Sequence, residues 1–233
     1  MKLYYDLHIH SALSPCGDND MTPNNIVNMS LLKGLDIIAV TDHNSCGNIR
    51  AVQKAAGDKL LVVPGMEIET SEEVHVVCYF PDVESAEKMN ELVKKHLPKI
   101  KNRTDIFGNQ YYMDENDKIC GEEEILLVNA TTLDIYSVFD SVRMLGGVAV
   151  PAHIDRTSYS VISNLGFIPP DLKTCAVEIT KQNLEKLKEK YKDCKILTNS
   201  DAHYLENISE KENYINILSK TTKDVLGFLC KKE

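Results

Sequence analysis

The alternation of apolar strand-like runs with amphipathic helical segments restricts this 233-residue chain to few folds. We expect strands at Lys2–His8, Leu35–Thr41, Leu60–Val63, Val74–Phe80, Val148–Pro151, Cys175–Thr180 and Ile196–Asn199. The run Leu35–Thr41 (LDIIAVT) is almost continuously apolar, which is typical of a strand covered on both faces. Repeated strand–helix units favour an α/β fold built on a parallel sheet or barrel with right-handed crossovers.

Helices are expected between these strands. The first begins at Thr22-Pro23, because threonine caps a helix and proline suits its first turn, and it ends at Gly34. The other expected helical segments are Asn48–Ala56, Glu84–Lys101, Asp134–Leu145, Asn183–Lys192 and most of the tail from Glu210 to Cys230. Residues 103–118 are polar and rich in turn formers, so we expect a hairpin-like excursion there, within a single domain that spans residues 1–233.

The composition is that of a globular protein and narrows its partners. With 43% hydrophobic and 26% charged residues, a disordered or collagen-like chain is excluded. The net charge of −9 argues against a large basic surface, so stable binding of duplex nucleic acid is not expected. The seven cysteines include no C-x-x-C pair, which favours a reducing compartment. No apolar run has the length of a signal peptide or membrane span, and we expect a cytoplasmic protein.

Six of the seven histidines lie on the expected strands or just after them. They are His8, His10, His43, His75, His153 and His203, and the acids Asp42, Glu67 and Asp201 occupy similar places. Sites are built where parallel strands end on one face, so residues distant in sequence converge there. His8 and His10 are two residues apart and point to the same side of a strand.

Each of these residues has a simpler reading when it is taken alone. Asp42 and Asp201 could be helix caps, and His75 could be a hydrogen-bonded core histidine. Burying all of these groups without partners would cost several kcal/mol each, so their conjunction predicts a metal cluster. Imidazole and carboxylate ligands suit Zn, Fe or Mn. The ligands are too many for one ion, and we expect two or three divalent ions with Glu67 or Asp201 bridging.

These motifs resemble the PHP family, the polymerase and histidinol phosphatase superfamily. The motifs are Asp6-Leu7-His8-Ile9-His10, Thr41-Asp42-His43, Gly65-Met66-Glu67, His75, Pro151-Ala152-His153 and Ser200-Asp201-Ala202-His203. They run in the family's order and cover most of the chain. The resemblance implies a distorted (β/α)7 barrel, a trinuclear metal site and phosphoesterase activity.

The resemblance also implies how the ligands are shared among three ions. The first ion would be held by His8, His10, Glu67 and Asp201, the second by Glu67, His75 and His153, and the third by His43 and His203. The third site usually has one more ligand after the H-x-H motif. Cys16 stands where histidinol phosphatase-like members have a histidine, and Asp18 or Asp20 could take the place instead.

We therefore expect metal-dependent hydrolysis of a phosphate ester, in which a metal-bound water becomes hydroxide near neutral pH and attacks phosphorus. Besides that water, Asp201 and His203 are the candidate catalytic groups, and Arg156 is the candidate phosphate-binding cation. The substrate would be a small phosphorylated metabolite, a nucleotide or a short oligonucleotide.

Two other functions are compatible with the same residues. One is a metal-stabilised binding or regulatory module without turnover. The other is an amidohydrolase-type metal hydrolase, which usually carries a bridging modified lysine on a strand. The apolar strands expected here contain no interior lysine, which disfavours the second alternative.

Overall fold

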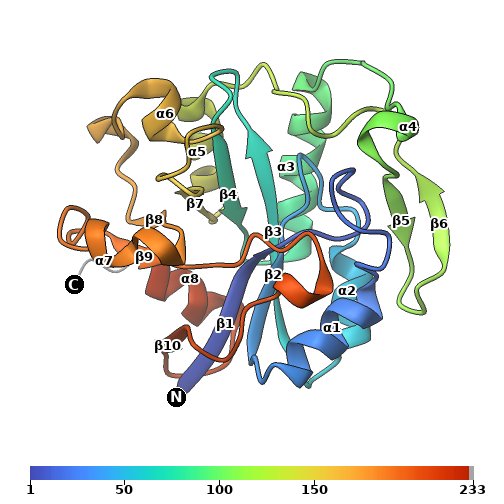
Figure 1. Ribbon diagram of the computed structural model, residues 1–233, viewed down its shortest axis with the longest axis horizontal. Coiled ribbons are helices and arrows are strands. Elements are labelled where there is room, and N and C mark those ends of the chain that lie inside the picture. The colour runs from blue at the N-terminus through green and yellow to red at the C-terminus, as the bar shows by residue number, and fades with distance from the viewer. Residues whose placement is uncertain (231–233) are drawn as a thin grey trace.

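The computed structural model describes residues 1–230, in which strands and helices alternate along most of the chain (Figure 1). The strands are β1 (Lys2–Ile9), β2 (Ile37–Val40), β3 (Leu61–Glu69), β4 (His75–Tyr79), β5 (Tyr111–Met113), β6 (Ile119–Glu122), β7 (Val148–Pro151), β8 (Ala176–Glu178), β9 (Lys195–Leu197) and β10 (Tyr214–Asn216).

The α-helices are α1 (Pro23–Leu32), α2 (Ile49–Ala56), α3 (Val83–His96), α4 (Thr104–Phe107), α5 (Ile135–Met144), α6 (Val161–Leu165), α7 (Leu184–Leu187) and α8 (Thr222–Cys230). Three 3₁₀ helices complete the set: η1 (Pro170–Leu172), η2 (Lys181–Asn183) and η3 (Leu205–Asn207). Within residues 1–230, none of the helices combines the length and the apolar composition needed to cross a membrane.

The main sheet has six strands in the order β10-β1-β2-β3-β4-β7. Strands β1, β2 and β3 are parallel, whereas β4 is antiparallel to both β3 and β7. Only residues 70–74 separate β3 from β4, which is too short for a crossover helix, so the two strands form an antiparallel pair. The expected α/β class is confirmed, but an entirely parallel sheet is not formed.

Strands β8 and β9 form a separate parallel pair beside the main sheet. In the described part of the chain a few hydrogen bonds, and no continuous ladder, join this pair to the main sheet. The Ile154 N–H donates to the Glu178 carbonyl (2.9 Å), and a parallel bridge pairs Ile9 with Ala202. Over residues 1–230 the strands therefore build a curled half barrel, and the exact (β/α)7 count of the expected distorted barrel is not confirmed.

A hydrogen bond across the concave side demonstrates the curl of the sheet. The Tyr79 hydroxyl of β4 donates to the Leu7 carbonyl of β1 over 2.9 Å, although β2 and β3 lie between these strands in the sheet. Leu7 and Tyr79 belong to a buried apolar cluster that also contains Val150 of β7 and Leu197 of β9. Strands from both sheets thus share one core.

Several element boundaries differ from those expected. Strand β3 continues to Glu69, so Glu67 lies within the strand and not after it. Helix α3 stops at His96 because Pro98 disfavours helical backbone at the preceding residue. The segment 183–192 contains only the short helix α7, and the tail is not mainly helical, because β10 pairs with the edge of β1 before α8 begins.

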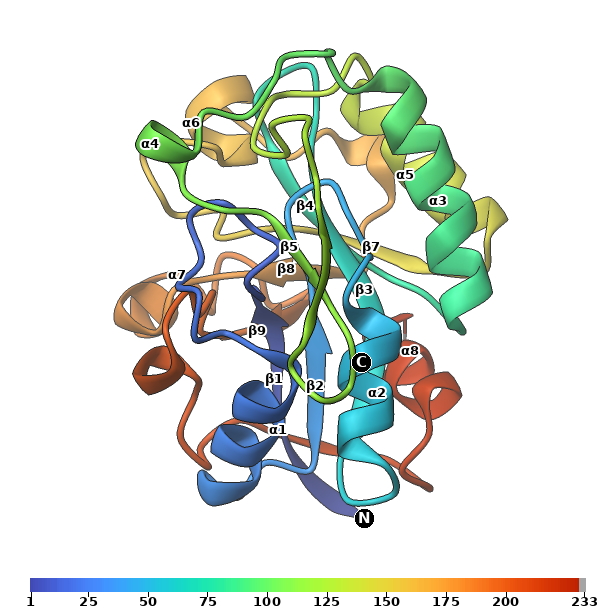
Figure 2. The same cartoon turned by 90° about the vertical axis from the view of Figure 1, so that its right-hand side faces the viewer.

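Strands β5 and β6 form an antiparallel hairpin that extends past residue 118 to Glu122. Figure 2 shows it on the side of the molecule that carries α1 and α2. The Asn48 side chain donates to the Tyr111 carbonyl and accepts the Met113 N–H, and the Asn24 N–H donates to Asp117. These bonds attach the hairpin to the helical layer.

The substitution Tyr79→Phe tests whether the bond across the curled sheet stabilises the fold. The buried Leu7 carbonyl loses its donor, so we expect the free energy of unfolding to fall by about 1–3 kcal/mol. Urea unfolding followed by circular dichroism measures the change. Tyr136→Phe, at a ring that is 44% exposed, is the control and should have an effect below about 0.5 kcal/mol. Unchanged stability of Tyr79→Phe would contradict the interpretation.

Candidate metal centre

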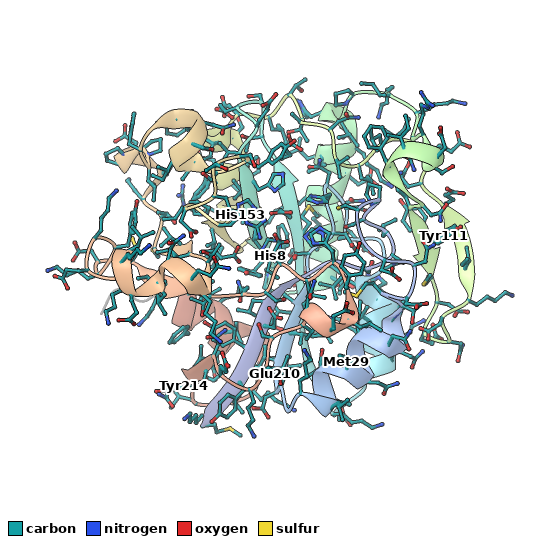
Figure 3. All side chains as sticks on the ribbon, in the orientation of Figure 1. His8, Met29, Tyr111, His153, Glu210 and Tyr214 are labelled. Atoms are coloured by element: carbon teal, nitrogen blue, oxygen red, sulfur yellow. The ribbon has the colours of Figure 1, made fainter. Side chains whose placement is uncertain are left out.

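The residues expected to form the site converge at one end of the curled sheet. They come from the ends of β1 (His8, His10), β2 (His43), β7 (His153) and β9 (Asp201, His203), from within β3 (Glu67) and from the start of β4 (His75). Because β4 runs antiparallel to its neighbours, its first residue lies at the same end of the sheet as the last residues of the others. Figure 3 shows His8 and His153 near each other in the centre of the molecule.

The Glu67 carboxylate lies at the centre of this cluster and is only 1% exposed. Five imidazole nitrogens lie close to its oxygens: His75 Nδ1 (3.0 Å), His43 Nδ1 (3.1 Å), His8 Nε2 (3.4 Å), His10 Nε2 (3.4 Å) and His153 Nε2 (3.4 Å). Neither Glu67 oxygen accepts a hydrogen bond within residues 1–230. One carboxylate thus faces five potential metal ligands.

Three groups of side chains have potential ligand atoms within 4.8 Å of one another. The groups are His8, His10, Glu67 and Asp201; His43, Glu67 and His75; and His10, His43 and His203. The first group contains the four residues expected around one ion. In the second group, His43 stands with Glu67 and His75 where His153 was expected. In the third group, His10 lies with the expected pair His43 and His203. His153 contacts Glu67 but belongs to none of the three groups.

The Asp201 carboxylate connects the cluster to Arg156. Its Oδ1 lies 3.3 Å from His8 Nε2 and 3.2 Å from His10 Nε2, while Oδ2 accepts a 2.6 Å hydrogen bond from Arg156 Nη1. Arg156 is half-exposed at a cavity of 150 Å³, here called the inner cavity, which Glu67, Tyr159 and several of the cluster histidines also line. The structure therefore places the predicted phosphate-binding cation at the mouth of the cluster.

The residues present fit a group of metal ions. Of the seven buried side-chain polar atoms that have no hydrogen-bond partner within residues 1–230, five belong to this cluster: both Glu67 oxygens, Asp201 Oδ1, His43 Nδ1 and His153 Nδ1. Buried polar atoms without partners are rare because each costs free energy. Imidazole nitrogens and carboxylate oxygens are ligands of divalent transition metals, and bound ions would satisfy these atoms.

Two groups of the cluster, Glu67 and His10, are held in the protonation states that bind metal. Burial raises the pKa of Glu67, but the imidazoles of His75 and His8 outweigh this effect and hold that pKa well below its usual value. Burial and the neighbouring His203 and His43 together depress the pKa of His10. An ionised carboxylate and a neutral imidazole are the forms that coordinate metals. Burial lowers the pKa of His8, His43 and His75, but nearby carboxylates outweigh it and raise that pKa, so these imidazoles must lose a proton when a metal binds.

Cys16 reaches the part of the cluster where a further ligand is expected. Burial raises the pKa of the Cys16 thiol, but interactions with the imidazoles of His43 and His203 lower it to about 6 overall. The Asp18 carboxylate instead accepts the N–H of Asp20 within an exposed turn. Of these three residues, Cys16 is the one whose side chain interacts with both imidazoles.

Glu178 is a buried residue of the site that we did not identify from the sequence. Both its oxygens lie 3.1 Å from His8 Nδ1; Oε1 also accepts the His153 N–H (3.1 Å), and Oε2 accepts from the Asn199 amide (2.7 Å). Such a carboxylate fixes the ring orientation and the tautomer of a ligand histidine. The available signal was a single acid inside the apolar run Ala176–Ile179.

Two further buried carboxylates hold the loops that carry candidate ligands. Asp42 is not a helix cap: it accepts the Ser11 N–H and the Ser14 hydroxyl, and Ser14 Oγ lies 2.9 Å from His10 Nδ1. Asp6 accepts the N–H and hydroxyl of Ser200, next to Asp201. Both carboxylates thus position candidate ligand residues.

The backbone at two candidate ligands is strained. His153 has a φ of 27° and Asp201 a φ of 54°, in the left-handed region that non-glycine residues seldom adopt. Strained backbone of this kind concentrates at functional sites, where the surrounding contacts enforce it. Here the hydrogen bond from the His153 N–H to Glu178 and the bonds around Asp6 supply those contacts.

The curled α/β sheet and its buried histidine–carboxylate cluster together define a candidate metal-binding protein of the α/β class. Residues 6–209 match the PHP domain family, and the chain belongs to this family. The resemblance found in the motifs is confirmed.

One related sequence is an uncharacterized protein of Methanocaldococcus jannaschii. It is 28% identical over 186 residues, which are 79% of this chain and 20% of the relative. The chain therefore spans only about a fifth of that protein.

Solved structures share the fold at low identity. A lesion-specific endonuclease, endonuclease Q of Pyrococcus furiosus, matches with a TM-score of 0.75 and 18% identity, over 99% of this chain and 56% of that one. A protein of Bifidobacterium adolescentis, provisionally assigned as a metal-dependent phosphoesterase, matches with a TM-score of 0.62 and 17% identity, over 97% and 95% of the two chains. At these identities the similarity establishes the fold.

The substitution Glu178→Ala tests the role of this buried carboxylate. Without it His8 Nδ1 has no acceptor, and we expect the affinity for Mn²⁺ or Zn²⁺ to fall about 10- to 100-fold. Competition with a chromophoric chelator measures the affinity. Glu122→Ala removes an exposed carboxylate from β6 and serves as the control. Equal affinity in the Glu178 and Glu122 variants would show that Glu178 does not position His8.

Proposed function

We propose that this protein hydrolyses phosphate esters with two or three divalent transition-metal ions, Zn, Fe or Mn, held by the cluster. The observation that carries the proposal is the Glu67 carboxylate, which is buried among five imidazole nitrogens and accepts no hydrogen bond from residues 1–230. Membership of the PHP family and the fold shared with phosphoesterase and endonuclease structures support a hydrolase.

The ligands of these ions come from the groups found at the strand ends. His8, His10, Glu67 and Asp201 would hold the first ion. Glu67, His75, His153 and His43 would hold the second, and His43, His203 and Cys16 are the candidates for the third. Bound ions would supply Lewis acidity and make a coordinated water acidic enough to act as a nucleophile near neutral pH.

Arg156 and Asp201 act together at the inner cavity. The planar guanidinium can bind two oxygens of a phosphoryl group, and its 2.6 Å bond to Asp201 holds it beside the cluster. Ser158 and Tyr159 line the same cavity, and their hydroxyl groups could donate hydrogen bonds to a phosphoryl group bound there. Asp201 thus contributes to both metal and phosphate binding.

His203 is the candidate for the final proton transfer. Its Nδ1 lies 2.9 Å from the Asp201 carbonyl oxygen and donates to it, which leaves Nε2 for other chemistry. Its side chain is 23% exposed, so a leaving group can reach it. Nε2 can either ligate the third ion or protonate the leaving oxygen, and these two roles are alternatives.

The nature of the inner cavity favours turnover over the two alternative functions. A structural metal site is closed, whereas a catalytic one keeps an open position, and here an exposed arginine and an open cavity adjoin the cluster. No lysine lies among the residues that line the inner cavity, so the bridging residue of amidohydrolase-type enzymes has no counterpart there.

A nucleic acid is a further candidate for the substrate. The fold similarity to endonuclease Q, one structure of which holds a 27-mer duplex with an abasic lesion at the active site, favours it. The net charge of −9 favours a small phosphorylated molecule or short oligonucleotide over a long duplex.

Metal content and hydrolysis measured on the same preparations test the proposed function. We expect the protein purified without chelator to hold two or three ions per chain by elemental analysis, and to hydrolyse p-nitrophenyl phosphate or its diester. His10→Ala and Asp201→Ala should each lose metal and more than about 100-fold of the activity, because both ligate the first ion. The absence of stoichiometric metal and of hydrolysis with added Mn²⁺ would refute the proposal.

Arg156→Ala separates phosphate binding from metal binding. Removing the guanidinium should raise KM about tenfold, which corresponds to roughly 1.4 kcal/mol, and leave the metal content unchanged. The control is Arg103→Ala, which removes an exposed arginine paired with Asp105 and should leave KM unchanged. An unaltered KM in the Arg156 variant would exclude this residue from phosphate binding.

A further inference from the structure

A second cavity adjoins the inner cavity. It has a volume of 390 Å³ and shares His153, Arg156 and Asp201 with the inner cavity; we call it the outer cavity. The rest of its wall comes from residues 178–182, residues 198–200, parts of 206–213 and Lys33. Small-molecule sites typically measure about 300–1,000 Å³, so the outer cavity can hold an organic group, whereas the 150 Å³ inner cavity suits a phosphoryl group.

Carboxylates outnumber cations on the wall of the outer cavity. The acidic residues are Glu178, Asp201, Glu206, Glu210 and Glu212, and the basic residues are Lys33, Arg156 and Lys181. Figure 3 labels Glu210 at a distance from His8 and His153, toward the N-terminal end of β1. The excess of negative charge therefore includes a part of the wall remote from the metal ligands.

Each of the three cations on this wall has a carboxylate partner. Lys33 Nζ lies 3.1 Å from a Glu210 oxygen and also donates to the Glu206 carbonyl at 2.7 Å. Lys181 pairs with Glu212, and Arg156 pairs with Asp201. A phosphate in the outer part of the cavity would have to displace a carboxylate from a lysine. The phosphate would then lie beside the displaced carboxylate, which has the same sign of charge.

Uncharged polar groups provide the remaining hydrogen-bonding capacity of the outer cavity. The side chains of Gln182 and Asn207 are exposed, and neither makes a hydrogen bond to the rest of residues 1–230. The Ser209 hydroxyl lies on the same wall, as does the Thr180 hydroxyl, which already donates to Asp155. Amide and hydroxyl groups both donate and accept, which matches a ligand rich in hydroxyl groups.

We propose that the outer cavity binds the alcohol portion of a phosphate monoester. This alcohol portion is uncharged and rich in hydroxyl groups, as in a sugar, and the cavity discriminates against substrates that carry a second phosphate. The inference rests on the proposed function and names the substrate class of that site. The phosphoryl group lies against Arg156 in the inner cavity, and the acidic wall repels an additional anion on the leaving group.

A matched pair of sugar phosphates tests the inference. The kcat/KM of the metal-loaded protein is measured for fructose 6-phosphate and for fructose 1,6-bisphosphate. Hydrolysis of p-nitrophenyl phosphate by the same preparation shows that the protein is active. We expect at least about tenfold higher kcat/KM for the monophosphate. In the double variant Glu210→Gln/Glu212→Gln, which frees Lys33 and Lys181, this preference should fall by about tenfold or reverse.

The control is the double variant Glu185→Gln/Glu189→Gln, which removes the same charge from exposed positions outside the cavity and should leave the preference unchanged. A parent protein that hydrolyses p-nitrophenyl phosphate but prefers the bisphosphate, or a preference unaltered by the cavity variant, would overturn the inference alone. Absence of any hydrolysis would refute the proposed function. Isothermal titration with both sugar phosphates then decides the inference: weaker binding of the bisphosphate supports it, and equal or tighter binding overturns it.

Discussion

The burial of Glu67 among five imidazoles is the constraint on which the rest of the site depends. A carboxylate that is 1% exposed, with no hydrogen-bond donor within residues 1–230, is costly unless a cation lies against it. The histidines around it come from β1, β2, β4 and β7, so the sheet must curl to bring those strands within reach of one residue on β3. The half barrel and the cluster are thus consequences of one arrangement.

The chain maintains this arrangement with a second set of buried carboxylates. Asp6, Asp42 and Glu178 are almost completely buried, and each accepts several hydrogen bonds from loops that carry candidate ligands. The energy of these bonds offsets the strain at His153 and Asp201, whose backbones adopt positive φ. Residues that stabilise the fold at this end of the sheet therefore also determine the positions of the candidate ligands.

Much of the site was accessible from the sequence, because strand order and the alternation of side chains determine which residues converge. His8 and His10 could be placed on one side of β1, and the residues after β2, β7 and β9 could be placed at the same end of the sheet. Glu178 escaped notice because one acid in a three-residue strand has no distinctive pattern. The grouping of His43 with Glu67 and His75 depends on side-chain orientations, which periodicity does not encode.

The fold was predictable to a similar extent. Long apolar runs identified the strands of the core. The antiparallel direction of β4 follows from a short loop, and the tail strand β10 follows from pairing with β1; both depend on tertiary contacts.

The most direct test of the metal centre is anomalous diffraction from crystals of the protein grown with Zn²⁺. The account predicts ions about 2.0–2.2 Å from Glu67 oxygens, each also bound to cluster histidines. Crystals in which Glu67 and its imidazoles instead bind only water or one another would contradict it.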